Sequence, residues 1–120
     1  MMEASSTALL TDRYELSMVQ ASLHSGAADR RAVFEVFARG LPAGRRYGIV
    51  AGIGRLLDAL ERFRFDDVTV DFLTHQGLVD EATARWLLSY RFFGDIDGYP
   101  EGECYVPGSP ILVGGAHRLR

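Results

Sequence analysis

Lysine, cysteine pairs and long hydrophobic runs are all missing from this chain. Cys104 is the single cysteine, which excludes an internal disulfide and any multi-cysteine metal site and favours a reducing compartment. No uninterrupted apolar stretch approaches the roughly 20 residues that cross a bilayer. Residues 1–10 lack the basic segment of a signal peptide. We therefore expect a cytoplasmic protein with no membrane partner.

Net positive charge is also missing. All 13 basic residues are arginines, and 16 acidic residues leave a formal net charge of −3. Without a positive field the chain lacks the main driving force for binding nucleic acid, so we expect no such partner. The absence of lysine excludes a Walker loop, and Gly52-Ile53-Gly54 begins a dinucleotide fingerprint in which Leu57 replaces the third glycine.

The composition that remains is that of an ordinary globular domain. Hydrophobic residues make up 48% and charged residues 24% of the 120 positions. A chain of this length buries roughly two thirds of its unfolded surface, which allows a small core. One domain is the natural expectation.

Helix signals occur in four places. Asp12 and Glu15 form a variant of the capping box ahead of a helix expected over residues 13–25. Leu16, Val19 and Leu23 give that helix one apolar stripe. Further helices are expected from Gly52, from residues 66 to 75 and from Asp80 onwards.

Strand signals separate these helices, so the expected class is α+β. Residues 31–39 are dense in Val and Phe and predict a strand with at least one buried face, and residues 46–50 predict a second. Residues 92–113 alternate short apolar stretches with Gly and Pro, a pattern typical of short strands and turns. Ile111–Val113 is expected to leave unpaired edges, because the tail at 114–120 offers no apolar partner.

Single polar side chains give no specific local signal. The histidines are isolated and are expected at the surface or at helix ends: His24, His75 and His117. Cys104 is expected to be a buried or half-buried structural thiol. Asp95 and Asp97 alternate on an expected strand and could form a carboxylate pair, although solvated turn residues explain them equally well.

Order and spacing across the chain carry more information than any single motif. Four segments follow one another: Leu9–Met18, Ala32–Arg39, Tyr47–Gly52, and Pro100-Glu101-Gly102 with Pro107–Leu112. Together they resemble the amino-terminal region of nicotinate phosphoribosyltransferases, over residues 8 to 113.

This resemblance implies an enzyme of NAD salvage. Such enzymes join nicotinate to the ribose of phosphoribosyl pyrophosphate, giving nicotinate mononucleotide and pyrophosphate with Mg²⁺, coupled to ATP hydrolysis through a transiently phosphorylated histidine. They are several times longer than this chain, and their irregular α/β barrel carries most of the catalytic apparatus. We therefore expect an amino-terminal fragment that is inactive alone and binds no cofactor by itself.

The resemblance also implies domain bounds and a fold. Residues 1–113 are expected to form the α+β, sandwich-like amino-terminal domain of a type II phosphoribosyltransferase, without the barrel that follows it. The non-matching tail at 114–120 is interpreted as a junction left by a truncated gene model, a frameshift or a split gene.

Two site residues follow from the family's Thr-Asp-x-Tyr signature, which matches Thr11-Asp12-Arg13-Tyr14. By resemblance, Tyr14 stacks near the nicotinate ring and Asp12 helps to shape the site, both in the active site of the neighbouring subunit of a head-to-tail homodimer. The residues alone leave a structural alternative open, in which Asp12 is only a helix cap and Tyr14 only a packing residue. Glu35 and Arg39 match a family strand pattern but have no assignable role beyond a same-face ion pair.

Two other hypotheses remain. In one, the chain is a non-catalytic partner domain that pairs with a separately encoded catalytic chain and contributes Asp12 and Tyr14 in trans. In the other, it is an unrelated small α+β domain whose motif matches arise by chance.

Overall fold

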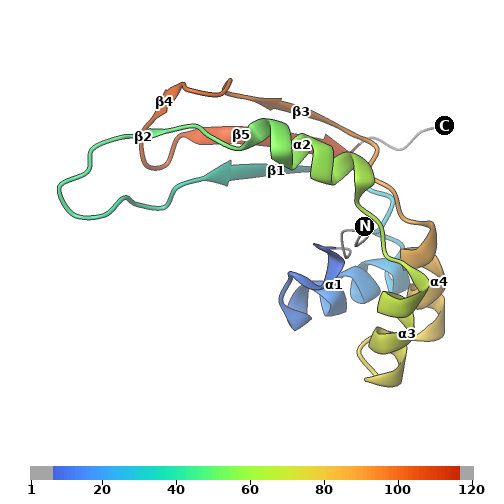
Figure 1. Cartoon of the computed structure of the whole chain (residues 1–120). Coiled ribbons are helices and arrows are strands. Elements are labelled where there is room, and N and C mark those ends of the chain that lie inside the picture. The colour runs from blue at the N-terminus through green and yellow to red at the C-terminus, as the bar shows by residue number, and fades with distance from the viewer. Residues whose placement is uncertain (1–6, 117–120) are drawn as a thin grey trace, which may run out of the picture. The chain divides into compact units, whose positions relative to one another are not determined.

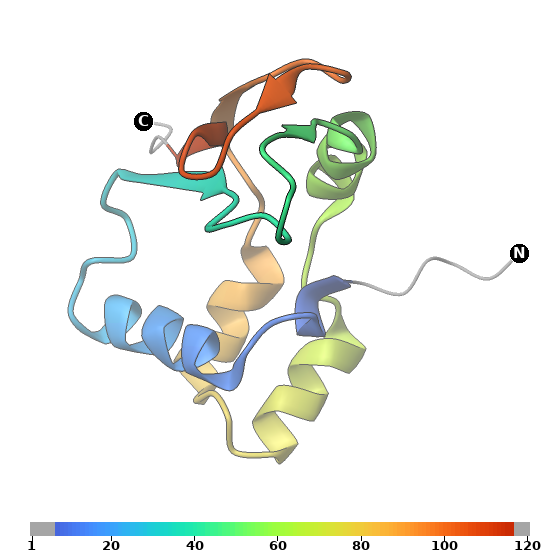
Figure 2. The same ribbon diagram turned by 90° about the vertical axis from the view of Figure 1, so that its left-hand side faces the viewer.

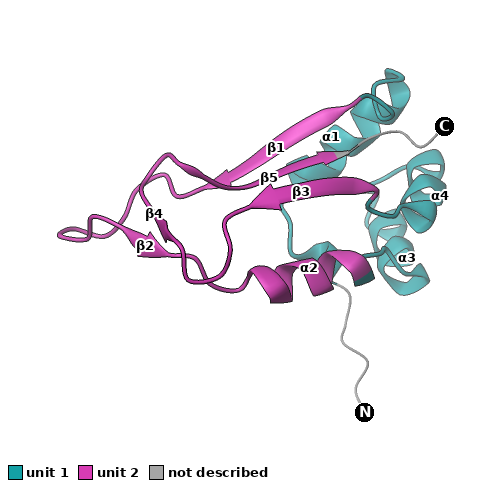
Figure 3. Cartoon of the chain, turned by 90° about the horizontal axis from the view of Figure 1, so that it is seen from above, with its two compact units in different colours: residues 1–30, 62–92 teal, residues 31–61, 93–120 magenta. Residues whose placement is uncertain are grey.

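The computed structural model describes residues 7–116 (Figure 1). Its contacts divide the chain into two compact units, each built from two separate stretches of sequence (Figure 3). Unit 1 comprises residues 1–30 and 62–92, and unit 2 comprises residues 31–61 and 93–120. The expected α+β composition is confirmed, with helices dominating unit 1 and both sheets lying in unit 2.

Unit 1 is helical (Figure 2). A short 3-10 helix (Thr7–Leu9) precedes α1 (Arg13–His24), and α3 (Asp67–His75) and α4 (Glu81–Ser89) follow later in the chain. Buried apolar side chains from all three α-helices and the α3–α4 loop form its core: Leu16, Val70, Leu73, Val79, Ala84 and Leu87. The expected helices are confirmed, and Leu16 of the apolar stripe predicted for α1 lies in this core.

Aspartates fix the starts of α3 and α4. Asp66 accepts a hydrogen bond from the Thr69 amide and Asp80 accepts one from the Thr83 amide, each at 2.8 Å. Hydrogen bonds from the Thr69 hydroxyl and amide lower the pKa of Asp66, and the hydrogen bond from the Thr83 amide lowers the pKa of Asp80. These contacts satisfy amide groups that a helix start leaves free.

A polar contact joins the end of α1 to the start of α4 within unit 1. His24 Nε2 lies 2.6 Å from Asp80 Oδ2. The Gln20 side-chain oxygen accepts a hydrogen bond from the Asp80 amide at 2.7 Å. Residues almost sixty positions apart thus hold the two helix ends together.

Unit 2 contains two antiparallel sheets and one helix. The larger sheet has the order β1-β5-β3, from Ala32–Phe37, Pro110–Ala116 and Gly94–Gly98. The smaller sheet pairs β2 (Gly48–Ile49) with β4 (Cys104–Tyr105). Helix α2 spans Ile53–Arg62.

Three strand predictions were wrong. β5 is the central strand and pairs along both edges, so Ile111–Val113 leaves no unpaired edge. β5 also runs past Val113 to Ala116, and residues 117–120 of the expected tail lie outside the described residues. All six residues of β1 are exposed, although a buried face was expected. A neighbouring strand in a sheet covers an edge of β1 and not a face, so pairing with β5 leaves the side chains of β1 exposed.

Gly98 marks a close approach inside the larger sheet. A Cβ atom at this position would overlap the Leu112 side chain and lie 2.8 Å from the Ile111 carbonyl oxygen. Leu112 is 6% exposed and cannot easily move away. Glycine is therefore required where β3 passes β5.

Candidate functional site at the start of α1

Asp12 occupies the N-cap position of α1. Glu15 Oε2 accepts a hydrogen bond from the Asp12 amide at 3.2 Å. The return contact of the capping box, from the Glu15 amide to the Asp12 carboxylate, does not reach hydrogen-bond geometry, and that amide bonds the Asp12 main-chain oxygen at 3.1 Å. The predicted cap is thus present, but its carboxylate is held less tightly than those of Asp66 and Asp80.

Tyr14 follows in the first turn of α1 and faces outward. Its side chain is 60% exposed, and Met18, one turn later, is 61% exposed. Leu16 takes the inward position of this turn and is 6% exposed. The alternative in which Tyr14 is a packing residue does not fit this arrangement, because the core of unit 1 does not contain its ring.

The two predicted site residues do not converge on one point of this chain. Residues two positions apart do not face each other on a helix, so Asp12 and Tyr14 cannot enclose a ligand from α1 alone. Across residues 7–116 no three His, Cys, Asp or Glu side chains gather as a metal site. The start of α1 by itself therefore does not enclose a ligand.

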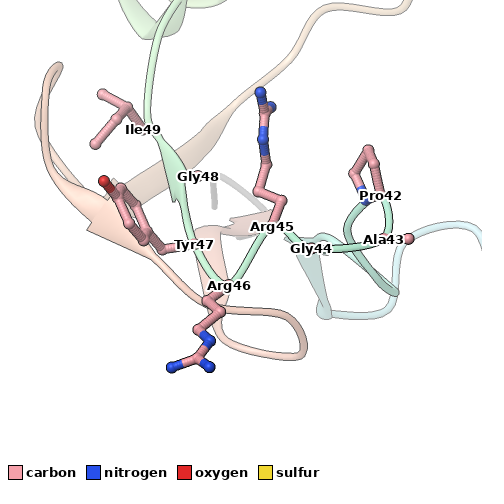
Figure 4. A pocket seen from close by; sticks show the side chains of 8 residues that line it. All are labelled: Pro42, Ala43, Gly44, Arg45, Arg46, Tyr47, Gly48 and Ile49. Carbon is pink, nitrogen blue, oxygen red and sulfur yellow. The ribbon is translucent and has the colours of Figure 1, made fainter.

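A surface hollow in unit 2 is the other feature of interest (Figure 4). Eight consecutive residues line it, from Pro42 to Ile49. The Arg45 and Arg46 side chains leave the loop in different directions, so the two guanidinium groups do not meet on one ligand. The hollow is a feature of loop conformation and carries no assembled binding groups.

The Gly52-Ile53-Gly54 segment binds a side chain of its own protein. Both carboxylate oxygens of Glu101 lie 3.0 Å from the Gly52 amide, and one lies 3.3 Å from the Gly54 amide. A carboxylate at a helix start is favoured by free amides and by the helix dipole. Sequence reasoning missed this contact, since Glu101 was noted only within a family motif and lies 49 positions from Gly52.

The remaining polar candidates have mixed outcomes. Cys104 is exposed and free, so the expectation of a buried or half-buried thiol was wrong. No ion pair joins Glu35 to Arg39, which lies two residues beyond the end of β1. Asp95 and Asp97 do alternate along β3 as expected.

The isolated histidines behave as single surface residues. His24 lies near the end of α1 and bonds Asp80. His75 ends α3 and its Nδ1 lies 2.9 Å from the Asp71 carbonyl oxygen. His117 lies outside the described residues.

Comparison with known proteins settles the family. The model of the nicotinate phosphoribosyltransferase N-terminal domain matches residues 9–116. The chain belongs to this family.

Named relatives agree with this nicotinate phosphoribosyltransferase assignment. The pncB1 enzyme of Mycobacterium tuberculosis is 60% identical over 104 residues, which cover 87% of this chain and 23% of the relative. A nicotinate phosphoribosyltransferase of Bacillus subtilis is 30% identical over 107 residues, covering 89% of this chain and 22% of the relative. The chain thus spans less than a quarter of these relatives.

The fold is shared with a solved member of the family. The crystal structure of human nicotinic acid phosphoribosyltransferase superposes with a TM-score of 0.77 at 29% identity, over 89% of this chain and 22% of that chain. The matched region is therefore the amino-terminal α+β domain. Within the described part, no helix has the length and apolar character needed to cross a membrane.

Proposed function

We propose that this chain supplies the nicotinate-binding Tyr14 and Asp12 of a nicotinate phosphoribosyltransferase. That enzyme joins nicotinate to the ribose of phosphoribosyl pyrophosphate and releases pyrophosphate. The observation that carries the proposal is the outward-facing Tyr14 ring, 60% exposed within the segment that matches the family. A flat aromatic face suits a pyridine ring, because offset stacking of two rings is favourable.

Asp12 acts on the position of Tyr14. The capping arrangement of Asp12 and Glu15 orders the first turn of α1, and Tyr14 lies inside that turn. A ring on an ordered helix start loses little conformational freedom when it binds. Asp12 therefore shapes the site by fixing where the ring points.

Both residues act in the active site of the neighbouring subunit of a homodimer. Asp12 and Tyr14 are two positions apart and do not face each other, so a second surface is needed to enclose nicotinate. The family's barrel, from the partner subunit, would supply that surface together with the residues that bind phosphoribosyl pyrophosphate.

Mg²⁺ and ATP belong to other parts of such an enzyme. The side chains of residues 7–116 include no group of three metal-ligating residues. The compartment that we propose is the cytoplasm, because an exposed free thiol such as Cys104 persists in a reducing environment.

A chimera tests the proposal. Residues 9–116 of this chain, which the family model matches, replace the corresponding segment of the M. tuberculosis pncB1 enzyme, to which the chain is 60% identical over 104 residues. We expect turnover from the chimera, and product at the level of a no-enzyme blank from the 120-residue chain alone. A folded but inactive chimera, or steady turnover by the chain alone, would contradict the proposal.

Tyr14→Ala in the chimera separates binding from packing. Loss of the stacked face should raise the KM for nicotinate roughly two- to tenfold, while the KM for phosphoribosyl pyrophosphate changes much less. Tyr14→Phe is the matched control and should be mild, because the ring face survives. If both constants rise together and the Tm falls, Tyr14 is a structural residue.

A further inference from the structure

Two side chains of α1 contact one residue at the start of α4. The Gln20 side-chain oxygen accepts a hydrogen bond from the Asp80 amide at 2.7 Å, and His24 Nε2 lies 2.6 Å from Asp80 Oδ2. An ionised carboxylate can only accept, so Nε2 carries the proton of this contact. The other carboxylate oxygen of Asp80 accepts a hydrogen bond from the Thr83 amide. Asp80 therefore connects α1 to α4 and also caps α4.

Gln20 and His24 form a row with Leu16 along α1, because residues four positions apart lie on one face of a helix. Leu16 is 6% exposed and lies in the core of unit 1. Tyr14 lies two positions before Leu16, which corresponds to a turn of about 200° around the helix, and its side chain is on the exposed side. The contacts of the row therefore determine where the Tyr14 side of the helix points.

Apolar packing alone defines the rotation of α1 loosely. The helix contributes the buried Leu16 and the partly buried Val19 to the core, and hydrophobic contacts are not directional. Hydrogen bonds, by contrast, weaken steeply when their distance or angle changes. Two such contacts, made from successive turns of α1 to one residue, permit little rotation of the helix about its axis.

We propose that Gln20 and His24 are positioning residues, which fix the rotation of α1 and thereby hold the Tyr14 ring in place. A rotation of about 10° moves a group about 6 Å from the helix axis by about 1 Å. A displacement of this size is large for a ring that must align with a substrate. The effect on nicotinate rests on the proposed function of Tyr14, whereas the fixed rotation of α1 does not.

The contact between His24 and Asp80 can be removed without unfolding the protein. The two side chains are 57% and 39% exposed, and exposed pairs of this kind contribute little to stability. His24→Ala removes the donor, while His24→Gln keeps an N–H donor in the place of Nε2. An effect on position can therefore be separated from an effect on folding.

Spin-label distances test the fixed rotation on the 120-residue chain. Cys104→Ser removes its one cysteine, and labels are attached through Met18→Cys on α1 and Val68→Cys on α3, two exposed positions of unit 1. We expect one narrow distance distribution for this parent and for His24→Gln. His24→Ala and Gln20→Ala should shift or broaden the distribution by about 1–2 Å.

His75→Ala is the matched control. His75 is also an exposed histidine at the end of a unit 1 helix, but its ring nitrogen contacts the Asp71 carbonyl oxygen of its own helix. Its distance distribution should match that of the parent, and circular dichroism checks that every variant is folded. Unchanged distributions for both His24→Ala and Gln20→Ala, or an equal change for His75→Ala, would overturn the proposal.

Kinetics of the chimera test the consequence for Tyr14. We expect His24→Ala to raise the KM for nicotinate by up to the roughly two- to tenfold effect of Tyr14→Ala, with a much smaller change in the KM for phosphoribosyl pyrophosphate. His24→Gln should restore most of the lost affinity. In the Tyr14→Ala background His24→Ala should not raise the KM further, because no ring is left to position.

The two proposals fail in different ways. If Tyr14→Ala leaves the KM for nicotinate unchanged, the proposed function fails, and the spin-label distances still decide whether α1 is fixed. If Tyr14→Ala raises this KM but His24→Ala does not, or if the two effects multiply in the double variant, the positioning proposal fails alone. A lower Tm with equal rises in both KM values would make His24 a structural residue and would also overturn it.

Discussion

At the scale of single residues, three aspartates show how one sequence signal gives different local structures. Asp12, Asp66 and Asp80 each precede a helix, and all three were predictable as caps. Two of them accept a close amide hydrogen bond, whereas the Asp12 carboxylate does not reach one. Local sequence predicts the position of a cap, but the geometry of its side chain depends on the surrounding turn.

The lowered pKa values of Asp66 and Asp80 lead to a prediction for acid conditions. A carboxylate whose folded-state pKa is lowered adds stability above its unfolded value, near 3.8, and this contribution is lost as pH falls through the folded value. The double variant Asp66→Asn, Asp80→Asn keeps both caps but removes the charge. We expect its Tm to lie below that of the wild type at neutral pH.

The difference in Tm should close as the pH falls from about 5 to about 2, as followed by circular dichroism. Asp12→Asn is the matched control and should show a smaller difference throughout. A difference in Tm between the double variant and the wild type that grows as the pH falls would contradict the assigned direction of the pKa shifts.

The candidate site was only partly predictable at this scale. Tyr14 and Asp12 could be named because a four-residue signature matched the family, while the inward and outward faces of α1 followed from helical spacing. The contacts from Glu101 to Gly52 and from His24 to Asp80 could not be predicted, because each joins residues about fifty positions apart. Local patterns carry no information about such pairs.

At the scale of elements, periodicity predicted which segments form helices and strands better than it predicted their neighbours. The Val- and Phe-rich β1 formed where expected but is exposed, because burial depends on what lies against a strand. Ile111–Val113 looked unpaired because nothing apolar follows it, yet it lies in the central strand β5. Strand order is a property of the whole unit and cannot be deduced from one segment.

The close approach of β3 and β5 predicts the effect of a single methyl group. Gly98→Ala should lower the free energy of unfolding by about 1–3 kcal/mol, since the new Cβ overlaps Leu112 and approaches the Ile111 carbonyl oxygen. Gly114→Ala is the control, because a Cβ there meets no atom within 4 Å. Urea denaturation of both variants measures the difference, and equal stabilities would contradict the steric argument.

At the scale of the whole molecule, the described chain consists of two units with different sources of stability. Unit 1 has a compact apolar core between its helices, whereas the larger sheet of unit 2 leaves β1 exposed. Chain length correctly predicted a small core, and the order of helix and strand signals correctly predicted the α+β class. It could not predict that the contacts divide into two units, because both units have an ordinary composition.

Shortening a buried side chain in the unit 1 core should therefore lower the free energy of unfolding of the protein. Leu73 is 1% exposed, and Leu73→Ala should cost about 2–5 kcal/mol, a large share of the roughly 5–15 kcal/mol that stabilises a typical protein. Val68→Ala on the same helix is the control at 79% exposure, with an expected change within about 0.5 kcal/mol. Thermal denaturation compares the two, and a Leu73→Ala Tm equal to that of the control would contradict the proposed core.

The interleaving of the two units has a consequence for synthesis on the ribosome. β1 is made early, but its one strand partner in the structure, β5, emerges only after residue 110. In the same way, α1 cannot form its contacts with α4 until the residues from Glu81 onwards have been made. Closing such long loops lowers the entropy of the chain before the stabilising contacts form, so both units finish folding late in synthesis. During translation, the Val- and Phe-rich β1 therefore stays unpaired until β5 has been made. Chaperones that bind extended apolar segments are expected to bind β1 during this interval.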